Sequence, residues 1–395
     1  MSKIDRLIAE TCPGGVEFRE LGEVGQFVRG GGLQRRDFVD EGFPCIHYGQ
    51  IYTFYGTSAA ATKSFIAPAL AATLKKAEPG DLVVTTTSEN VEDVCTAVAW
   101  LGDMEIAIGG HSCAFKHTLD PMYAAYYFQT EQFEVQKQRF VTGTKVKDIK
   151  VADIARIQIP VPPLVVQREI GSVLQKMESI KAELASELSS ELERRARQYA
   201  FCRDQLLTFS DEGGVRWSTL VEVAVNLDSR RRPVTKGARE PGKYPYYGAS
   251  GVVDYVSAYI FDGDYLLVSE DGANLLARST PIAFSASGKL WINNHAHVLQ
   301  FEDYPSRRFI EFYLNSIDLA PYISGAAQPK LNKANLNRIP VPVPSPAEQE
   351  RIVAILDRFD ALVIDLSVGL SAEIEARQKQ YEYHRDKLLT FEEAA

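Results

Sequence analysis

Two long proline-free stretches of this chain carry the same pattern of apolar and polar positions. In residues 164–209, apolar side chains recur at intervals of three and four, and the intervals repeat 182 positions later, in residues 347–391. Such a heptad stripe is typical of helices that pack against another helix. A helix of about 45 residues is roughly 65 Å long, too long for an ordinary globular helix. The predicted interface positions are Ile170, Val173, Met177, Ile180 and Leu184 in the first stretch and Ile352, Ile355, Phe359, Leu362 and Leu366 in the second.

A proline-rich segment precedes each predicted helix, IPVPPL at 159–164 and IPVPVPSP at 339–346. Proline donates no backbone hydrogen bond and restricts the residue before it, so we expect extended linkers that end the preceding element. Each helix then ends on nearly the same phrase, RDQLLTF at 203–209 and RDKLLTF at 385–391. The helices could pack separately on their own domains. Two similar units in one chain favour a pseudo-two-fold arrangement instead, with the helices antiparallel to each other.

The chain is therefore an internal repeat. Its two copies also begin alike, with GGVEFRELGEV at 14–24 and GGVRWSTLVEV at 213–223, but these are 199 residues apart. The first copy accordingly carries extra residues between its two ends. We expect globular domains at 1–163 and 210–346, and long helices at 164–209 and 347–395.

Short β-like runs broken by Gly and Pro fill the two globular regions, which predicts mixed α/β domains. The strongest strand candidates and the paired short helices are these: LVVTTTSE (82–89), YLLVSED (265–271), FPCIHYG (43–49) and YPYYGASG (244–251), with helices near 121–137 and 307–317.

Composition narrows the function class. The chain of 395 residues is 45% hydrophobic and 24% charged, as in globular proteins. It has no apolar run of about 18 residues and a charged beginning, so we expect a cytoplasmic protein with no membrane partner. Five scattered cysteines indicate reduced, structural thiols. The net charge of −9 argues against a nucleic-acid partner, although the acidic excess lies in the first and last segments and leaves room for local basic patches.

Motifs for catalysis are missing from the sequence. It contains no GxxxxGK[ST], HExxH, GxSxG or strand-following GxGxxG pattern. His295-Ala-His297 could place two imidazoles on one strand face, but a metal site needs further ligands. His111-Ser-Cys113 lacks a third group to orient a nucleophile. We therefore expect no catalytic residue, no metal and no cofactor on this chain.

Basic, aromatic and amide side chains in the divergent regions are the remaining candidates. Arg and Lys engage phosphates, while Gln, Asn, Arg and Ser can pair with base edges. The candidate DNA-binding residues are Arg29, Arg35, Arg36, Lys63, Thr86, Ser88, Lys145 and Lys147 in the first copy, and Arg230, Arg231, Arg232, Lys236, Tyr246, Tyr247, Arg278, His295, Gln328 and Lys330 in the second.

These motifs together resemble the specificity subunit of type I restriction–modification systems. The resemblance rests on CPGGVEFRELGEV near the start, on GAAQPKLNKANLNRIPVPVPSPAEQERIVAILDRFD (325–360) and on the repeated RD[QK]LLTF, and it covers essentially the whole chain. The first copy departs from the family phrase, with TGTKVKDIK where the second has GAAQPKLNK.

The resemblance implies a non-catalytic subunit that recognises double-stranded DNA. Each target-recognition domain would read one half of a bipartite site, and the helices would act as spacer and as docking sites for two methyltransferase subunits. Restriction (motor) subunits would join the larger complex, and S-adenosylmethionine, ATP and Mg would bind to partners. The alternative from another class is a coiled-coil adaptor with two ligand-binding lobes that do not bind DNA, which the net acidity favours.

Overall fold

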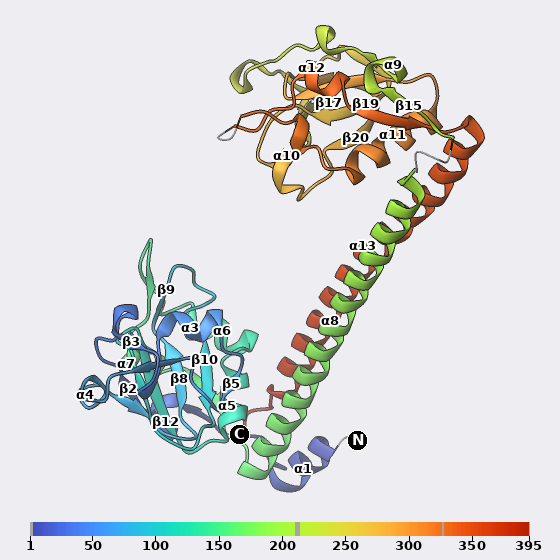
Figure 1. Ribbon diagram of the computed structural model, residues 1–395. Helices are drawn as coiled ribbons and strands as arrows, with labels where there is room; N and C mark the ends of the chain where they lie inside the picture. The colour runs from blue at the N-terminus through green and yellow to red at the C-terminus, as the bar shows by residue number, and fades with distance from the viewer. Residues whose placement is uncertain (1–2, 210–213, 326–327, 395) are drawn as a thin grey trace. The chain divides into compact units, whose positions relative to one another are not determined.

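The computed structural model describes residues 3–209, 214–325 and 328–394 (Figure 1). The chain forms two compact units: the first unit holds residues 1–187 and 371–395, and the second holds residues 188–370. Each unit therefore contains one globular region and one half of each long helix. The expected domain boundary at residue 210 lies outside the described residues, and the four domain ranges stay a prediction.

The globular region of the first unit consists of short strands and short helices. Its elements are α1 (Lys3–Thr11), β1 (Phe18–Glu20), α2 (Leu21–Val24), β2 (Gly25–Arg29), η1 (Arg35–Asp37), β3 (Phe38–Val39), β4 (Phe43–Ile46), α3 (Tyr48–Thr53), β5 (Ser58–Ala59), β6 (Ser64–Ile66), α4 (Pro68–Ala71), β7 (Lys76–Ala77), β8 (Leu82–Thr85), β9 (Thr87–Ser88), β10 (Ala97–Trp100), β11 (Ile106–Ile108), β12 (Ser112–His117), α5 (Pro121–Tyr127), α6 (Glu131–Lys137), β13 (Lys147–Asp148), α7 (Val151–Ile154) and β14 (Gln158–Pro160).

Two five-stranded sheets organise these elements, with strand orders β2-β12-β8-β10-β5 and β3-β6-β4-β11-β7. Helix α5 packs beside the first sheet and buries Tyr123, Tyr126 and Tyr127. A buried tyrosine needs a partner for its hydroxyl. Tyr123 donates to the carbonyl of Pro160 at 2.9 Å, and Tyr127 donates to that of Gln158 at 2.7 Å, so α5 fixes β14 in place.

The globular region of the second unit is built on one six-stranded sheet, in the order β16-β21-β19-β20-β17-β18. Its elements are β15 (Arg216–Thr219), α9 (Leu220–Val223), β16 (Val225–Asn226), η3 (Asp228–Arg230), η4 (Lys236–Ala238), β17 (Pro241–Gly248), β18 (Gly251–Val256), β19 (Phe261–Ser269), α10 (Asn274–Ala277), β20 (Ala283–Ile292), β21 (Ala296–Gln300), α11 (Tyr304–Ser316), η5 (Ala320–Tyr322), α12 (Lys333–Asn337) and β22 (Pro340–Val343).

The helix expected over 121–137 is two helices, α5 and α6. Thr130 separates them because its hydroxyl oxygen accepts a hydrogen bond from the backbone N–H of Phe133 at 3.2 Å and begins α6 as an N-cap. Its counterpart α11 is continuous. The two copies therefore differ in this pair of short helices.

Each proline-rich segment forms one strand of a two-stranded sheet, β14 with β1 and β22 with β15. The register pairs Phe18 with Pro160 in the first unit and Trp217 with Pro342 in the second. These positions are related by the offsets of 199 and 182 read from the sequence. The backbone register therefore agrees with the predicted repeat.

Helices α8 (Leu164–Leu207) and α13 (Pro346–Leu388) have 44 and 43 residues. In the first unit, Lys181 of α8 donates to Gln378 of α13 at 2.9 Å. In the second unit, the rings of Tyr199 and Phe359 lie 6.4 Å apart. Early residues of one helix thus meet late residues of the other, so the two helices run antiparallel (Figure 1). The prediction of two mixed α/β domains joined by an antiparallel helix pair is confirmed.

The repeated RD[QK]LLTF phrases are exchanged between the two copies. Leu207, from the end of the first copy, is buried in the core of the second unit beside Val341 and Ile352. Leu389, from the end of the second copy, is buried in the core of the first unit beside Ile159. Each copy therefore completes the core of the other copy's globular domain.

Candidate nucleic-acid interface

A tight hairpin precedes the proline segment in the first unit. Thr142 and Asp148 exchange two backbone hydrogen bonds of 2.9 Å. Gly143 has a φ of +96°, and a Cβ there would lie 2.0 Å from the carbonyl oxygen of Val146, so the turn requires glycine. The hairpin pairs with β9 through Lys147 and Ser88.

The second unit has the same hairpin 182 residues later. Ser324 and Lys330 exchange backbone hydrogen bonds of 2.9 and 2.8 Å, and Gly325 has a φ of +83°. Lys330 also forms a bridge with Asp271, just beyond β19. The register therefore makes Lys330 equivalent to Asp148, one residue along from Lys147. Ala326 and Ala327 of the GAAQPKLNK phrase lie outside the described residues.

The residue after each hairpin is held in the same way. The N–H of Ile149 donates to the carbonyl of Thr86 at 3.0 Å, and the N–H of Leu331 donates to that of Glu270 at 2.8 Å. The backbone N–H groups of Thr86 and Glu270 in turn donate to the backbone carbonyls of His111 and His295, each at 2.9 Å. We call residues 142–148 the first hairpin and residues 324–330 the second hairpin. Both sit on one backbone frame, although their side chains differ.

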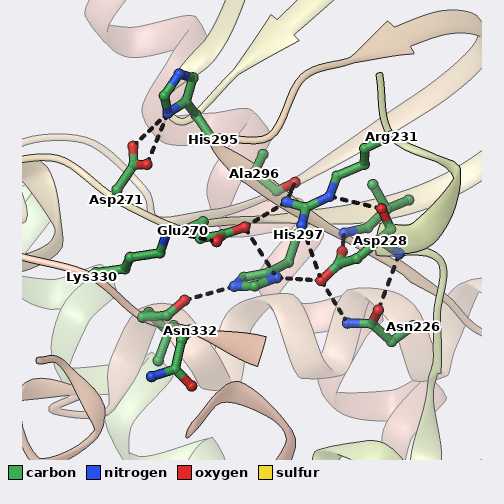
Figure 2. Close-up of polar contacts among 12 residues, drawn as sticks. Asn226, Asp228, Arg231, Glu270, Asp271, His295, Ala296, His297, Lys330 and Asn332 are labelled. Atoms are coloured by element: carbon green, nitrogen blue, oxygen red, sulfur yellow. Dashed lines mark hydrogen bonds and ion pairs between the residues drawn. The ribbon is translucent and has the colours of Figure 1, made fainter. Parts of the chain in front are cut away.

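Charged side chains lie beneath the second hairpin (Figure 2). Arg231 donates through Nη1 to Glu270 Oε2 at 2.6 Å and to the carbonyl of Ala296 at 2.8 Å. The fully buried His297 places Nδ1 2.6 Å from Asp228 Oδ2. Buried charges of opposite sign thus neutralise each other here.

These contacts shift the pKa of both carboxylates. Burial raises the pKa of Glu270, but the hydrogen bond from Arg231 and the charge of His297 outweigh burial and hold that pKa below its ordinary value. Burial likewise opposes ionisation of Asp228, yet the hydrogen bond from His297 leaves the Asp228 pKa lowered. Both carboxylates are therefore anions at neutral pH.

Three predicted residues meet at the exposed edge of this cluster. Lys330 lies with Nζ 3.2 Å from Glu270 Oε1 and its side chain is 51% exposed. His295 bonds through Nδ1 to Asp271 at 2.8 Å, and Gln328 is exposed. Lys330 and His295 therefore both lie beside Asp271, and Gln328 stands two residues before Lys330 in the same hairpin.

The three consecutive arginines have three different environments. Arg231 is part of the buried cluster. Arg230 lies over the ring of Phe261, 4.9 Å from its centroid, and Arg232 is exposed. Arg230, Arg232 and Lys236 are therefore the exposed basic side chains of this segment, and Arg231 is not exposed.

Tyr246 and Arg278 serve the fold. Tyr246 is 1% exposed, and its hydroxyl accepts from the N–H of Val234 at 3.0 Å. Arg278 donates to the carbonyls of Leu314 and Ile317, at 3.5 and 2.7 Å, where α11 ends. A cation at a helix C-terminus satisfies carbonyls that lack partners within the helix. Tyr247 is half-buried in the sheet.

In the first unit, β9 pairs Ser88 with Lys147, and Thr86 lies directly before β9; both Thr86 and Ser88 are buried. Lys147 is half-buried and donates to the carbonyl of Gly143 at 3.1 Å, while Lys145 is exposed. The remaining predicted residues, Arg29, Arg35, Arg36 and Lys63, are exposed, and they come from β2, η1 and the loop before β6.

An aromatic cluster beside Arg35 was not predicted from the sequence. The ring of Tyr48 lies 4.6 Å from that of His47 and 4.9 Å from that of His111. Burial, followed by the charge of Arg35, lowers the pKa of His47. Aromatic faces beside a cation can stack bases and contact phosphates. FPCIHYG gave a strand signal, but nothing local indicated that His111 would meet it.

The predicted helix interface is distributed over several environments. Ile170 and Ile352 are fully buried in the globular cores, whereas Ile180, Leu362 and Leu366 are 64, 57 and 37% exposed. The remaining positions, Val173, Met177, Leu184, Ile355 and Phe359, are half-buried.

His295 and His297 do not converge on a common point. His295 precedes β21 and faces Asp271, whereas His297 points inward to Asp228. Among the residues that the structure describes, no group of three or more His, Cys, Asp or Glu side chains could hold a metal ion. Within the same residues, every helix is too short or too polar to span a bilayer.

The model of the type I restriction modification DNA specificity domain matches this chain twice, over residues 13–194 and 215–376. The chain belongs to this family. The two matches coincide with the two structural copies, each with a hairpin on the common frame. The assignment favours DNA recognition over the adaptor alternative.

Relatives in two bacteria carry related names. The chain is 40% identical over 183 residues to S.HindORF215P of Haemophilus influenzae, which bears the name of a type I restriction enzyme specificity subunit; the match covers 45% of this chain and 47% of that protein. It is 31% identical over 267 residues to the EcoR124I/EcoR124II specificity subunit of Escherichia coli, covering 61% of this chain and 65% of that one. The chain thus spans about half and just under two thirds of these relatives.

Solved structures share the fold at low identity. A chain from a structure of type I R-M complex assembly has a TM-score of 0.72 and 18% identity, covering 95% of this chain and 98% of its own length. The HsdS subunit from Thermoanaerobacter tengcongensis has a TM-score of 0.58 and 19% identity, covering 95 and 97%. Both solved chains therefore share the fold of this chain over 95% of its length.

Proposed function

We propose that this chain is the DNA-recognition subunit of a type I restriction–modification complex, and that each globular domain reads one half of an asymmetric bipartite site. The observation that carries the proposal is the double match of a DNA specificity family to two copies with one hairpin frame. A common frame with different side chains suits two half-sites of different sequence.

Base reading is assigned to the exposed hairpin side chains. In the second domain, the Gln328 amide can pair with a base edge, and Lys330 can reach a phosphate or a guanine. In the first domain, Lys145 and the surface around Arg35 and Tyr48 take these roles. Arg36, Lys63, Arg232 and Lys236 supply sequence-independent phosphate contacts, which fix the orientation of the duplex.

The long helices set the separation of the two half-sites and dock two methyltransferase subunits. Clusters of exposed apolar side chains mark interaction sites, and one short stretch of α13 exposes Leu362, Ile364 and Val368 by 57, 59 and 64%. Motor–nuclease subunits join the larger complex. In this proposal the chain acts in the cytoplasm and supplies no catalytic group, and S-adenosylmethionine, ATP and Mg²⁺ bind to the partners.

Methylation mapping in a host with and without the gene, together with its partner genes, tests the proposal. A bipartite methylated motif should appear only when the gene is present. The double variant Gln328→Ala/Lys330→Ala should relax one half of that motif, and the matched variant Lys145→Ala/Lys147→Ala should relax the other half. Relaxation of both halves by either variant, or of neither, would contradict local reading by the hairpins.

A second experiment tests the spacer role. Removal of one heptad from both α8 and α13, in register, should shorten the unread segment between the half-sites because the helix pair remains in phase. Retention of the original spacing by a folded variant would show that the helices do not measure it.

A further inference from the structure

His297 bonds through both ring nitrogens to groups that accept hydrogen bonds. Nδ1 lies 2.6 Å from Asp228 Oδ2, and Nε2 lies 2.7 Å from the backbone carbonyl oxygen of Leu331. A neutral imidazole carries one N–H and would leave one acceptor facing a bare nitrogen. The ring is fully buried, so solvent water cannot hydrogen-bond to a ring nitrogen that lacks a proton. Only the doubly protonated imidazolium can donate a hydrogen bond to both acceptors at once.

The surrounding charges suit a cation at this position. Asp228, from η3, and Glu270, at the end of β19, are the anions that face the ring, with Glu270 Oε2 3.8 Å from Nδ1. Arg231 faces both carboxylates, whereas Lys330 faces Glu270. The Asp271–His295 pair lies outward, beside Lys330 (Figure 2). Asp228 Oδ1 also accepts from the N–H of Val298 at 2.9 Å, so the carboxylate that orients His297 is itself fixed.

Leu331, the acceptor for His297, directly follows the second hairpin. Its N–H donates to the backbone carbonyl of Glu270, and its carbonyl oxygen lies 2.7 Å from His297 Nε2. Both backbone groups are therefore held from inside the domain. We propose that the buried imidazolium of His297 is a positioning residue that holds Gln328 and Lys330 in register for base reading. This inference rests on the proposed function and deepens it for one half-site.

The first domain lacks this device. Strand register places Cys113 opposite Val84 in the first unit, as it places His297 opposite Val268 in the second. A cysteine there offers no comparable cation to a hairpin carbonyl. Loss of the imidazolium should therefore affect one half of the bipartite site and leave the other half unchanged.

The first test needs no DNA and uses the full-length chain. In protein labelled with ¹⁵N-histidine, both His297 nitrogens should resonate as protonated nitrogens. In His297→Gln and in Asp228→Asn, hydrogen exchange at the Leu331 amide should become about tenfold faster, because a charge-assisted hydrogen bond is lost. Exchange at Ile149 should not change. Gln300→Ala, an exposed change on the same strand, should match the unsubstituted chain.

The second test uses the assembled methyltransferase complex with the same variants. His297→Gln should lower discrimination about tenfold at the half-site read by the second domain, with the other half unchanged. An NMR spectrum that shows one His297 nitrogen without a proton overturns the proposal. So does a folded variant in which exchange at the Leu331 amide and discrimination at the half-site are both unchanged. If His297→Gln does not fold, Asp228→Asn and the spectrum of the unsubstituted chain decide the outcome. Absence of any bipartite motif would refute the proposed function, while the exchange data would still decide the loop contact.

Discussion

The two hairpins share a backbone frame, but the side chains at matching positions beneath them differ in charge. Beneath the first hairpin lie Thr86 and Cys113, which are uncharged, whereas Glu270 and His297 occupy the matching positions beneath the second. One frame therefore accepts either a neutral or a charged support.

The neighbouring strands extend this contrast. Arg29 pairs with Cys113 in strand register, and the same repeat offset of 199 places Asp228 beside His297. A buried ion network is poor evidence for extra stability, because desolvation offsets much of the attraction. What the second domain gains is a buried ion network that fixes the backbone directly after its hairpin.

The largest effect expected from this contrast follows Glu270→Gln. The substitution leaves Arg231 and His297 without one of their anions, and breaking a buried pair in this way costs about 3 kcal/mol. Urea unfolding, followed unit by unit through native-state hydrogen exchange, measures the loss. Thr86→Ala is the matched change in the first unit and should cost far less; equal losses would mean that the charged support is not specific to the second unit.

The next largest difference is expected in acid, which should destabilise the second hairpin more than the first. The pKa values of Asp228 and Glu270 are lowered in the folded chain, so their stabilisation is present above the ordinary values of 3.8 and 4.5 and is lost as pH falls through the lowered values. Each unit of pKa difference corresponds to about 1.4 kcal/mol. Exchange at Leu331 should accelerate in acid relative to Ile149, after correction for intrinsic rates. Burial raises the pKa of the Cys113 thiol to about 12, so that group stays neutral throughout.

The shared frame predicts equal responses where the backbone decides. Gly143→Ala and Gly325→Ala should each cost about 1–2 kcal/mol, because both positions have positive φ and a Cβ would press on a carbonyl oxygen. Thermal unfolding of each variant provides the comparison. Gly237→Ala is the control, since its Cβ would meet no atom within 4 Å and its φ is not positive. A loss in one hairpin alone would refute the common frame.

The smallest effect belongs to Thr86→Val. The Thr86 hydroxyl oxygen is buried and has no hydrogen-bond partner among the described residues. Removing an unsatisfied hydroxyl while keeping the shape is neutral or stabilises by about 1 kcal/mol. A measured destabilisation above that size, by chemical unfolding, would show that this hydroxyl contributes to the first hairpin after all.

Local sequence predicted the frame well. The offsets of 182 and 199 agree with the register of the strands formed by the proline segments, whereas Ile180 and Leu362 of the predicted helix stripe are exposed. The offset of 182 relates Gly143 to Gly325, and both have positive φ.

Side-chain roles were harder to predict because their partners lie far away in sequence. Arg231 looked like an exposed phosphate anchor in a run of three arginines, yet Glu270 and Ala296 hold it inside. Arg278 likewise bonds to Leu314 and Ile317, some 40 residues later. Composition cannot distinguish a cation that faces solvent from one that completes a distant helix end.

The exchange of the terminal phrases has a consequence for the order of folding during synthesis. Val16 pairs with Glu393, and Leu389 fills the core of the first unit. Contacts of such sequence separation form late, after the intervening chain has been made. The second unit receives Leu207 before most of its own strands are translated and can close as they emerge. The domain whose translation begins first is therefore the last to complete its core.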